Sequence, residues 1–294
     1  MQVMAARRSD DVLDDVVHAV RVRSGVRVAE LDASATPGFS GDRDAGEELL
    51  ASIGERMSDV QERLFAHGRT GGTRSVLLVL QGLDTAGKGG IVRHVLGLVD
   101  PQGVALRSFG RPTPEELEHD FLWRIRKALP PAGRIGVFDR SHYEDILVPS
   151  VNGTADAVTL TERFAAIEAF ERELVAGGTS IVKVALWVSR DEQYARLRER
   201  LERPDKHWKY SPGDVDVRAA RPAYEAAYDD VLARSSYDDG VFQAPWHLVP
   251  ADRKWYARLA VSALLLRALD DLDLDWPPAT FDVATELARL DATR

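Results

Sequence analysis

The 294-residue chain contains no cysteine. This absence excludes disulfides, a thiolate nucleophile, and zinc or iron–sulfur centres with Cys ligands. Long apolar runs are also missing: Val76–Leu80 and Leu259–Leu266 fall far short of the roughly 20 residues that cross a bilayer. The two arginines near the N-terminus are followed by acidic residues and not by an apolar segment, so no signal peptide is expected. We therefore expect a cytoplasmic protein that does not enter a membrane.

Positive charge is scarce as well. Lys and Arg number 38 against 47 Asp and Glu, which gives a formal net charge of −9. Such an acidic balance argues against unspecific binding to nucleic acid, and we expect no nucleic-acid partner. The composition, 45% hydrophobic and 29% charged, is that of a globular protein.

The apolar pattern predicts strands that alternate with helices. Continuous apolar strands are typical of a sheet buried on both faces, and helices between them imply parallel pairing. A helix is expected from Leu49 to Gly68, preceded by an N-terminal extension, residues 1–48, that is partly loop. Residues 49–294 would form the main domain. The expected strands are Ser75–Gln81, Val104–Ser108, Ile135–Phe138, Ile181–Val188 and Trp246–Val249, and the further helices are Lys88–Val99, Thr113–Leu129, Thr161–Ala176 and Arg253–Leu269.

A glycine-rich loop follows the first strand. Residues 82–90, GLDTAGKGG, fit the phosphate-binding pattern G-x4-G-K between a strand and a helix. In such a loop the backbone N–H groups face phosphate oxygens, and Lys88 adds a full charge. The usual Ser or Thr after the lysine is Gly89, whereas a carboxylate, Asp84, lies inside the loop. We expect Asp84 to replace the missing hydroxyl as a Mg²⁺ contact, because a bare carboxylate would repel phosphate. The candidate phosphate-binding residues here are Gly82, Ala86, Gly87, Gly89 and Gly90.

The alternative for this loop is a glycine-rich turn in which Asp84 is only a local cap.

A second charged segment follows the strand that ends at Phe138. Asp139 stands where such proteins place an acidic residue near the metal or the attacking group. Arg140 could clamp phosphate oxygens, and Glu144 and Asp145 could hold a metal or shape the acceptor pocket. The alternative is a surface turn with internal ion pairs.

Residues 196–210, RLRERLERPDKHWKY, form a basic stretch in an acidic chain. Downstream of a phosphate loop, such a stretch favours a helical lid, about residues 196–217, that closes over the substrates and excludes water. The alternative is a solvated helix face supported by pairs four residues apart, such as Arg198 with Glu202.

These segments together resemble the type-2 polyphosphate kinase family. The resemblance is carried by QGLDTAGKGGIVRHVLGLVDPQGV, SFGRPTPEELEHDFLWRIRKALP, IGVFDRSHYEDILV, ERPDKHWKYSPGDV and VPADRKWYARLAV, and it extends from about Glu47 to Pro277. It implies a P-loop kinase fold, a three-layer α/β/α sandwich with a parallel central sheet and a helical lid. It also implies reversible phosphoryl transfer between inorganic polyphosphate and nucleotides that depends on Mg²⁺, with Mn²⁺ as an alternative ion.

The resemblance also implies roles for single residues. Asp84, Lys88, Asp139, Arg140 and Glu144 would form the catalytic set, with Asp84 and Asp139 holding Mg²⁺. The lid would bind phosphate through Arg200, Lys206 and Lys209, and Phe109 and Arg111 would lie near the acceptor nucleotide. Ser141–Asp145 resembles the subgroup that accepts both AMP and ADP, and guanine nucleotides are a further candidate. Proteins of this family commonly form homodimers or homotetramers.

Two other functions stay open on the sequence. One is an ATP-dependent nucleoside monophosphate kinase on the same fold, although no donor-adenine pocket is evident. The other is a non-catalytic binding regulator, which the presence of the whole catalytic set disfavours.

Overall fold

A five-stranded parallel sheet forms the centre of the protein, whose computed structural model describes residues 2–294, with side chains from residue 9 onward. The strand order is β2-β3-β1-β4-β7. Register places Leu80 of β1 beside Asp139 of β3, so the carboxyl ends of these neighbours meet at one edge. The strands are β1 (Ser75–Gln81), β2 (Val104–Ser108), β3 (Ile135–Asp139), β4 (Thr179–Trp187) and β7 (Trp246–Pro250), and a separate hairpin comprises β5 (Tyr237–Asp238) and β6 (Gln243–Ala244).

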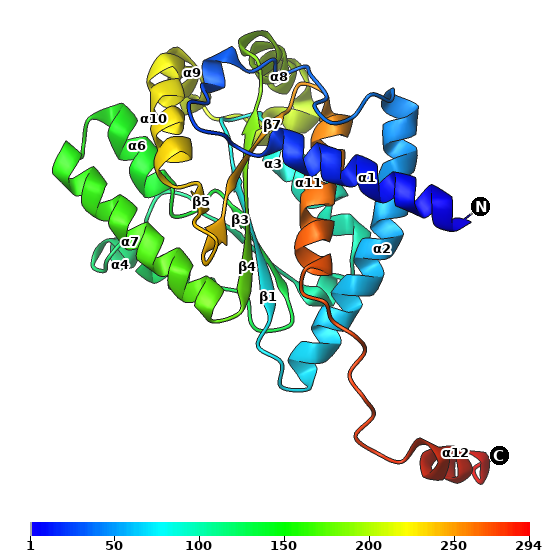
Figure 1. Ribbon diagram of the computed structural model, residues 1–294. Coiled ribbons are helices and arrows are strands. Elements are labelled where there is room, and N and C mark those ends of the chain that lie inside the picture. Colours follow the sequence, from blue (N-terminus) through cyan, green and yellow to red (C-terminus); the bar gives the residue numbers. More distant parts are fainter. Residues whose placement is uncertain (1) are drawn as a thin grey trace.

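Helices cover both faces of this sheet, which confirms the three-layer sandwich (Figure 1). On one face lie α1 (Gln2–Val20), α2 (Arg43–Arg69), α3 (Lys88–His94) and α11 (Lys254–Asp270). On the other face lie α6 (Glu144–Asn152), α7 (Ala157–Ala176) and α10 (Arg221–Arg234). Every residue of β1 is buried, as expected for a central strand packed on both sides.

The N-terminal region contributes to the core. Leu13, Val16 and Val20 of α1 are buried against the α11 layer. The chain then pairs with the edge of β7, where Val22 N donates to Trp246 O at 2.9 Å. Helix α2 starts at Arg43, because the Asp42 side chain accepts a hydrogen bond from Ala45 N. This helix therefore runs through residue 48, where we expected the extension to end, and the domain division stays a prediction.

The prediction of one continuous helix over Thr113–Leu129 is wrong. The structure has two short helices, α4 (Pro114–Leu117) and α5 (Trp123–Arg126). Thr113 and Glu116 form a capping box, so the start is as expected. The break comes at Asp120, whose side chain accepts from Leu122 N and begins a new turn. The helix expected from Lys88 to Val99 likewise ends at His94 and continues as a 3₁₀ turn, Leu96–Leu98.

The segment predicted as a lid, about residues 196–217, lies over the carboxyl ends of the strands (Figure 1). Its residues belong to α8 (Arg190–Glu202), a 3₁₀ helix, η4 (Pro204–Lys209), and α9 (Gly213–Ala219). At the C-terminus, α12 (Val283–Asp291) lies apart from the body at the end of an extended connection (Figure 1). Among the described residues no helix combines the length and apolar character that crossing a bilayer requires.

Candidate active site

The glycine-rich loop curls around the carboxyl end of β1. Gly82 and Gly87 have φ values of +151° and +113°, and a Cβ at Gly82 would lie 2.6 Å from the carbonyl oxygen of Leu186. Both positions therefore need glycine. Thr85 adopts a φ of +70° between them, which is uncommon for a side chain branched at Cβ. The loop thus holds a strained shape of the kind found at ligand sites.

Lys88 faces back into this loop. Its Nζ donates to Gly82 O at 2.6 Å, and the side chain is buried. Burial lowers the pKa of Lys88, as does Arg140, while Asp139, Asp84 and Glu144 oppose the shift. The five residues predicted as the catalytic set therefore lie close enough to act on one another's charge.

Arg140 connects the two predicted segments. Its guanidinium Nη2 lies 3.0 Å from Asp84 Oδ1, and its backbone has a φ of +64°. Burial lowers the pKa of Arg140, but Glu144, Asp84 and Asp139 together raise it above its ordinary value. The left-handed backbone is unusual for arginine and turns the chain where β3 ends.

Glu144 accepts a hydrogen bond from Gln81, a residue that the sequence did not predict to be part of the site. With its amide oriented to satisfy its neighbours, Gln81 donates to Glu144 Oε1 at 2.9 Å and accepts from Ser141 N at 3.1 Å. Gln81 is fully buried at the end of β1, and a polar side chain directly after the apolar run of SVLLVLQ could have revealed it. Burial raises the pKa of Glu144, although Arg140 and Lys88 lower it.

The described residues fit a divalent ion that arrives with phosphate. Among them no three His, Asp or Glu residues gather into a metal-binding group. Asp84 and Asp139 each interact with Lys88 and Arg140, so they offer two carboxylates at one place. Mg²⁺ commonly takes one or two carboxylates and completes its coordination with waters and substrate phosphates.

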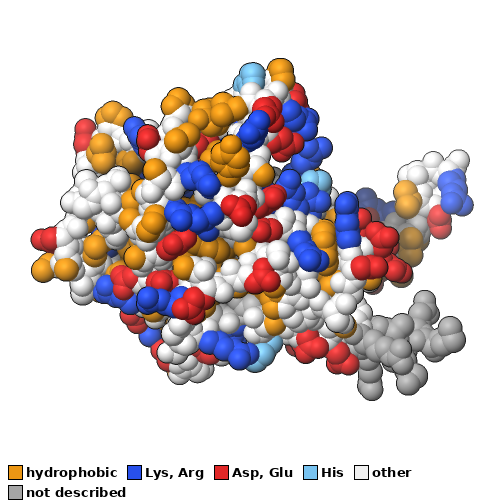
Figure 2. Space-filling model, turned by 90° about the horizontal axis from the view of Figure 1, so that it is seen from above, with side chains coloured by type: hydrophobic (Ala, Val, Ile, Leu, Met, Phe, Trp, Pro, Cys, Tyr) orange, Lys and Arg blue, Asp and Glu red, His pale blue; other side chains and the backbone are white. Residues whose placement is uncertain are grey.

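A cationic cavity of about 190 Å³ lies between the loop and the lid. Lys254 and Arg258 of α11 line it and were missed, although they belong to the quoted run RKWYAR. The predicted residues that line it are Ala86, Gly87, Gly90, Arg200, Lys206 and Lys209. We call this the donor-side cavity. Viewed from this end, Figure 2 shows Lys and Arg side chains interspersed with carboxylates.

Two of the three predicted lid cations, Arg200 and Lys206, are paired within the lid. Arg200 lies 3.1 Å from Asp214, and Lys206 lies 2.5 Å from Glu199. Arg196 is fixed more firmly, because its guanidinium donates to Thr85 O at 2.8 Å and to Ala251 O at 2.7 Å. Arg196 therefore ties α8 to the glycine-rich loop.

A larger cavity of about 630 Å³ lies on the other side of the loop, and we call it the acceptor-side cavity. Tyr224 and Tyr228 of α10 line it, and no motif in their local sequence predicted them as site residues. Phe109 lines it from a buried position, with its ring 5.0 Å from that of Phe138. The predicted residues at this cavity are Gly82, Asp84, Phe109, Arg111, Arg140 and Glu144. Gly89 is exposed and lines neither cavity.

Comparisons with known proteins agree on one family. Residues 40–276 match the family described as Polyphosphate kinase 2 (PPK2). The chain is 39% identical over 246 residues to the AMP/ADP-polyphosphate phosphotransferase of Meiothermus ruber, which covers 84% of this chain and 89% of that protein. It is 41% identical over 245 residues to the ADP-polyphosphate phosphotransferase of Rhodopseudomonas palustris, covering 79% and 82%.

A solved structure is similar over nearly the whole chain. The crystal structure of Polyphosphate Kinase 2 from Arthrobacter aurescens TC1 superposes with a TM-score of 0.91 at 52% identity, covering 95% of this chain and 97% of that one. Together with the parallel sheet and the loop geometry, this similarity confirms the expected P-loop kinase fold.

Proposed function

The chain belongs to the polyphosphate kinase 2 family, and we propose that it transfers phosphoryl groups reversibly between inorganic polyphosphate and nucleotides. The acceptors are AMP and ADP, in keeping with the names of the two curated relatives. Guanine nucleotides stay a prediction from the sequence.

One observation carries this proposal: two cavities of different chemistry meet at a single phosphate loop. The donor-side cavity is lined by the lid and by Lys254 and Arg258, and no aromatic residue is among its described lining residues. Polyphosphate repeats its charge along the chain and has no base, so cations alone suffice to bind it. The acceptor-side cavity offers Phe109, Tyr224 and Tyr228, which suit a nucleotide base.

The reaction needs alignment and charge neutralisation more than covalent chemistry. We assign Lys88 and Arg140 to the oxygens of the transferred group, because Lys88 is held by the loop that separates the two cavities and Arg140 lines the acceptor-side cavity beside that loop. An acceptor phosphate has a second pKa of about 6, so its attacking oxygen is already ionised at neutral pH. Asp139 is therefore assigned to metal binding and not to general base catalysis.

We assign Mg²⁺ to Asp84 and Asp139, with Mn²⁺ as a possible substitute. When bound, the ion would neutralise charge on the phosphates. Glu144 is assigned to the acceptor, where its half-buried carboxyl and the neighbouring Arg140 line the larger cavity.

The lid is assigned to polyphosphate and to the exclusion of water. Arg200, Lys206 and Lys209 line the donor-side cavity, and closure would prevent phosphoryl transfer to water. A homodimer or homotetramer and a cytoplasmic location stay predictions from the sequence.

A direct assay separates this function from an ATP-dependent nucleoside monophosphate kinase. The purified protein is incubated with AMP, Mg²⁺ and long-chain polyphosphate in the absence of ATP. We expect ADP first and ATP later in the time course. If neither forms until ATP is added, polyphosphate is not the donor and the proposal fails.

A further inference from the structure

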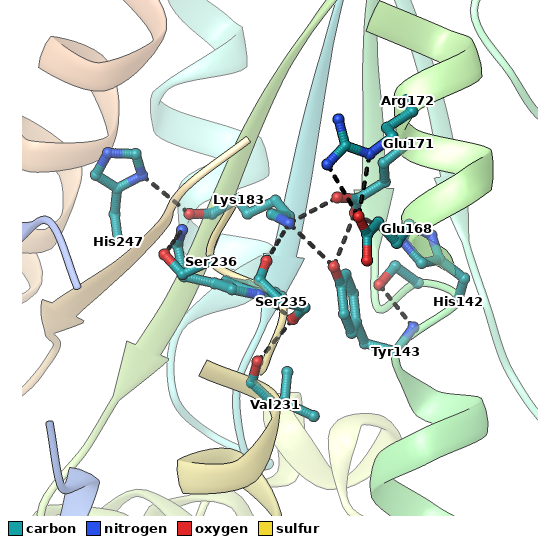
Figure 3. A network of polar contacts seen from close by, with 12 residues as sticks. His142, Tyr143, Glu168, Glu171, Arg172, Lys183, Val231, Ser235, Ser236 and His247 are labelled. Carbon is teal, nitrogen blue, oxygen red and sulfur yellow. Dashed lines mark hydrogen bonds and ion pairs between the residues drawn. The ribbon is translucent and has the colours of Figure 1, made fainter. Parts of the chain in front are cut away.

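A buried ionic cluster lies behind the segment that carries Arg140 and Glu144. Lys183 of β4 and Glu171 of α7 have no exposed side-chain surface. The Lys183 Nζ donates to Glu171 Oε2 at 2.6 Å, to Ser235 O at 2.6 Å and to Tyr143 Oη at 3.0 Å (Figure 3). All three ammonium donors are thus used.

Two contacts of this cluster fasten the catalytic segment itself. Tyr143 Oη donates to Glu171 Oε1 at 2.8 Å, and His142 Nε2 lies 3.1 Å from the same oxygen (Figure 3). His142 and Tyr143 stand between Arg140 and Glu144 in the chain. The side chains of His142 and Tyr143 point into the core. Their contacts with Glu171 therefore fix the backbone of Arg140 and Glu144, which line the acceptor-side cavity.

Stability alone is a poor reason for such a cluster. Burying an ion pair removes both charges from water, and well-packed apolar residues in its place often give a protein that is as stable or more stable. Burial lowers the pKa of Lys183, while Glu171 opposes this shift by charge and hydrogen bonding. Among the described residues that line the acceptor-side cavity, none belongs to the cluster. Its members therefore act on substrate through elements that do line the cavity: the segment 140–144, and α10, which Ser235 caps.

We propose that Glu171 and Lys183 are positioning residues of the acceptor site, acting through Tyr143 and His142. The inference rests on the proposed function, because the acceptor is the nucleotide assigned to that cavity. By holding the segment at two side chains, the cluster keeps Arg140 and Glu144 aimed at the acceptor phosphate. A displacement of about 1 Å at such groups can cost on the order of 100-fold in rate.

The test compares two Tyr→Phe variants that each lose one buried hydroxyl. Tyr143→Phe removes one of the two links between the cluster and the segment and leaves the contact of His142 with Glu171. Tyr256→Phe is the matched control, since its Oη donates to Pro37 O at 2.6 Å from α11, in the opposite layer of the sandwich. KM and kcat are measured for AMP and for polyphosphate, below the melting temperature of both variants. We expect Tyr143→Phe to raise the KM for AMP by about tenfold and to leave the KM for polyphosphate within about twofold.

Tyr256→Phe should leave all of these constants unchanged while losing comparable thermal stability. Equal kinetics in the two variants would overturn the proposal, because loss of a buried hydroxyl would then have only a structural effect. A kinetic loss spread equally over AMP and polyphosphate would overturn it as well.

A double variant, Glu171→Gln with Lys183→Met, removes both charges and leaves no unpaired ion. We expect it to fold and to show the same selective loss for AMP. Wild-type kinetics in the folded double variant would refute the role of the cluster. Absence of polyphosphate-dependent activity in the wild type is a separate result, which refutes the proposed function itself.

Discussion

Replacing Lys254 and Arg258 by glutamine tests the assignment of the two cavities to two substrates. Both residues line the donor-side cavity, and among the described residues neither forms an ion pair. Burial lowers the pKa of Arg258, as do Arg43 and Arg93, while Glu47 opposes them. A bound polyanion would relieve this repulsion, so both cations should stabilise the complex with polyphosphate.

The expected rise in the KM for polyphosphate depends on how exposed each cation is to water. A cation about 4 Å from a phosphate charge is worth about 1 kcal/mol in water and about 4 kcal/mol at an effective dielectric constant of 20. Lys254 is exposed and Arg258 is half-buried. We therefore expect Lys254→Gln to raise the KM for polyphosphate about fivefold and Arg258→Gln about tenfold or more, since about 1.4 kcal/mol is a factor of ten.

The assay measures initial rates of ADP formation with either substrate varied, at low and high ionic strength. Arg111→Gln is the matched control, because it removes an exposed cation from the acceptor-side cavity. It should raise the KM for AMP and leave that for polyphosphate unchanged. Added salt should weaken polyphosphate binding less in the Arg258 variant than in the wild type. If Lys254→Gln and Arg258→Gln change only the KM for AMP, the assignment of the cavities is refuted.

Three further substitutions test single residues of the catalytic set. Lys88→Met should lower kcat by about 100- to 1,000-fold; because burial disfavours the charged lysine, thermal melts should show no loss of stability. Asp84→Asn should lower activity and move half-saturation by Mg²⁺ to higher concentration; an unchanged Mg²⁺ titration would exclude it as a metal contact. Burial raises the pKa of Glu144 above 4.5, so the native state retains its proton longer than the unfolded state. Hence the free energy of unfolding should fall as pH rises from 4.5 through the raised pKa, and Glu144→Gln should lack this slope in urea denaturation.

The sequence predicted the parts of the site that are local in the chain. The loop after β1 could be recognised because its glycines, its lysine and the strand before it lie within about 15 residues. Asp139 and Arg140 followed from the end of the next buried strand. In a parallel sheet, the carboxyl ends of neighbouring strands come together, so their proximity to Lys88 could be expected.

Other parts depend on tertiary contacts that no local pattern reveals. Tyr224 and Tyr228 reach the acceptor-side cavity only because α10 packs over α6. The helix breaks at Asp120 because its side chain accepts the hydrogen bond from Leu122 N that a continuous helix would use. The spacing of apolar residues, on which the prediction rested, carries no information about such a contact. The burial of Lys183 was hidden as well, since a lysine in a strand gives no sign that its partner Glu171 lies on a distant helix.

The two outer strands of the sheet differ in how they are covered. β2 is open, with Leu106 half-exposed, whereas β7 is paired by residues 21 and 22 after α1. An uncovered strand offers free N–H and C=O groups to another chain and invites aggregation. The segment after α1 therefore covers the edge of β7, and Leu13 and Val16 of α1 bury apolar side chains of the neighbouring core. A chain shortened to begin at Arg43 would retain both cavities, yet we expect it to self-associate through β7 and to lose solubility before it loses its active site.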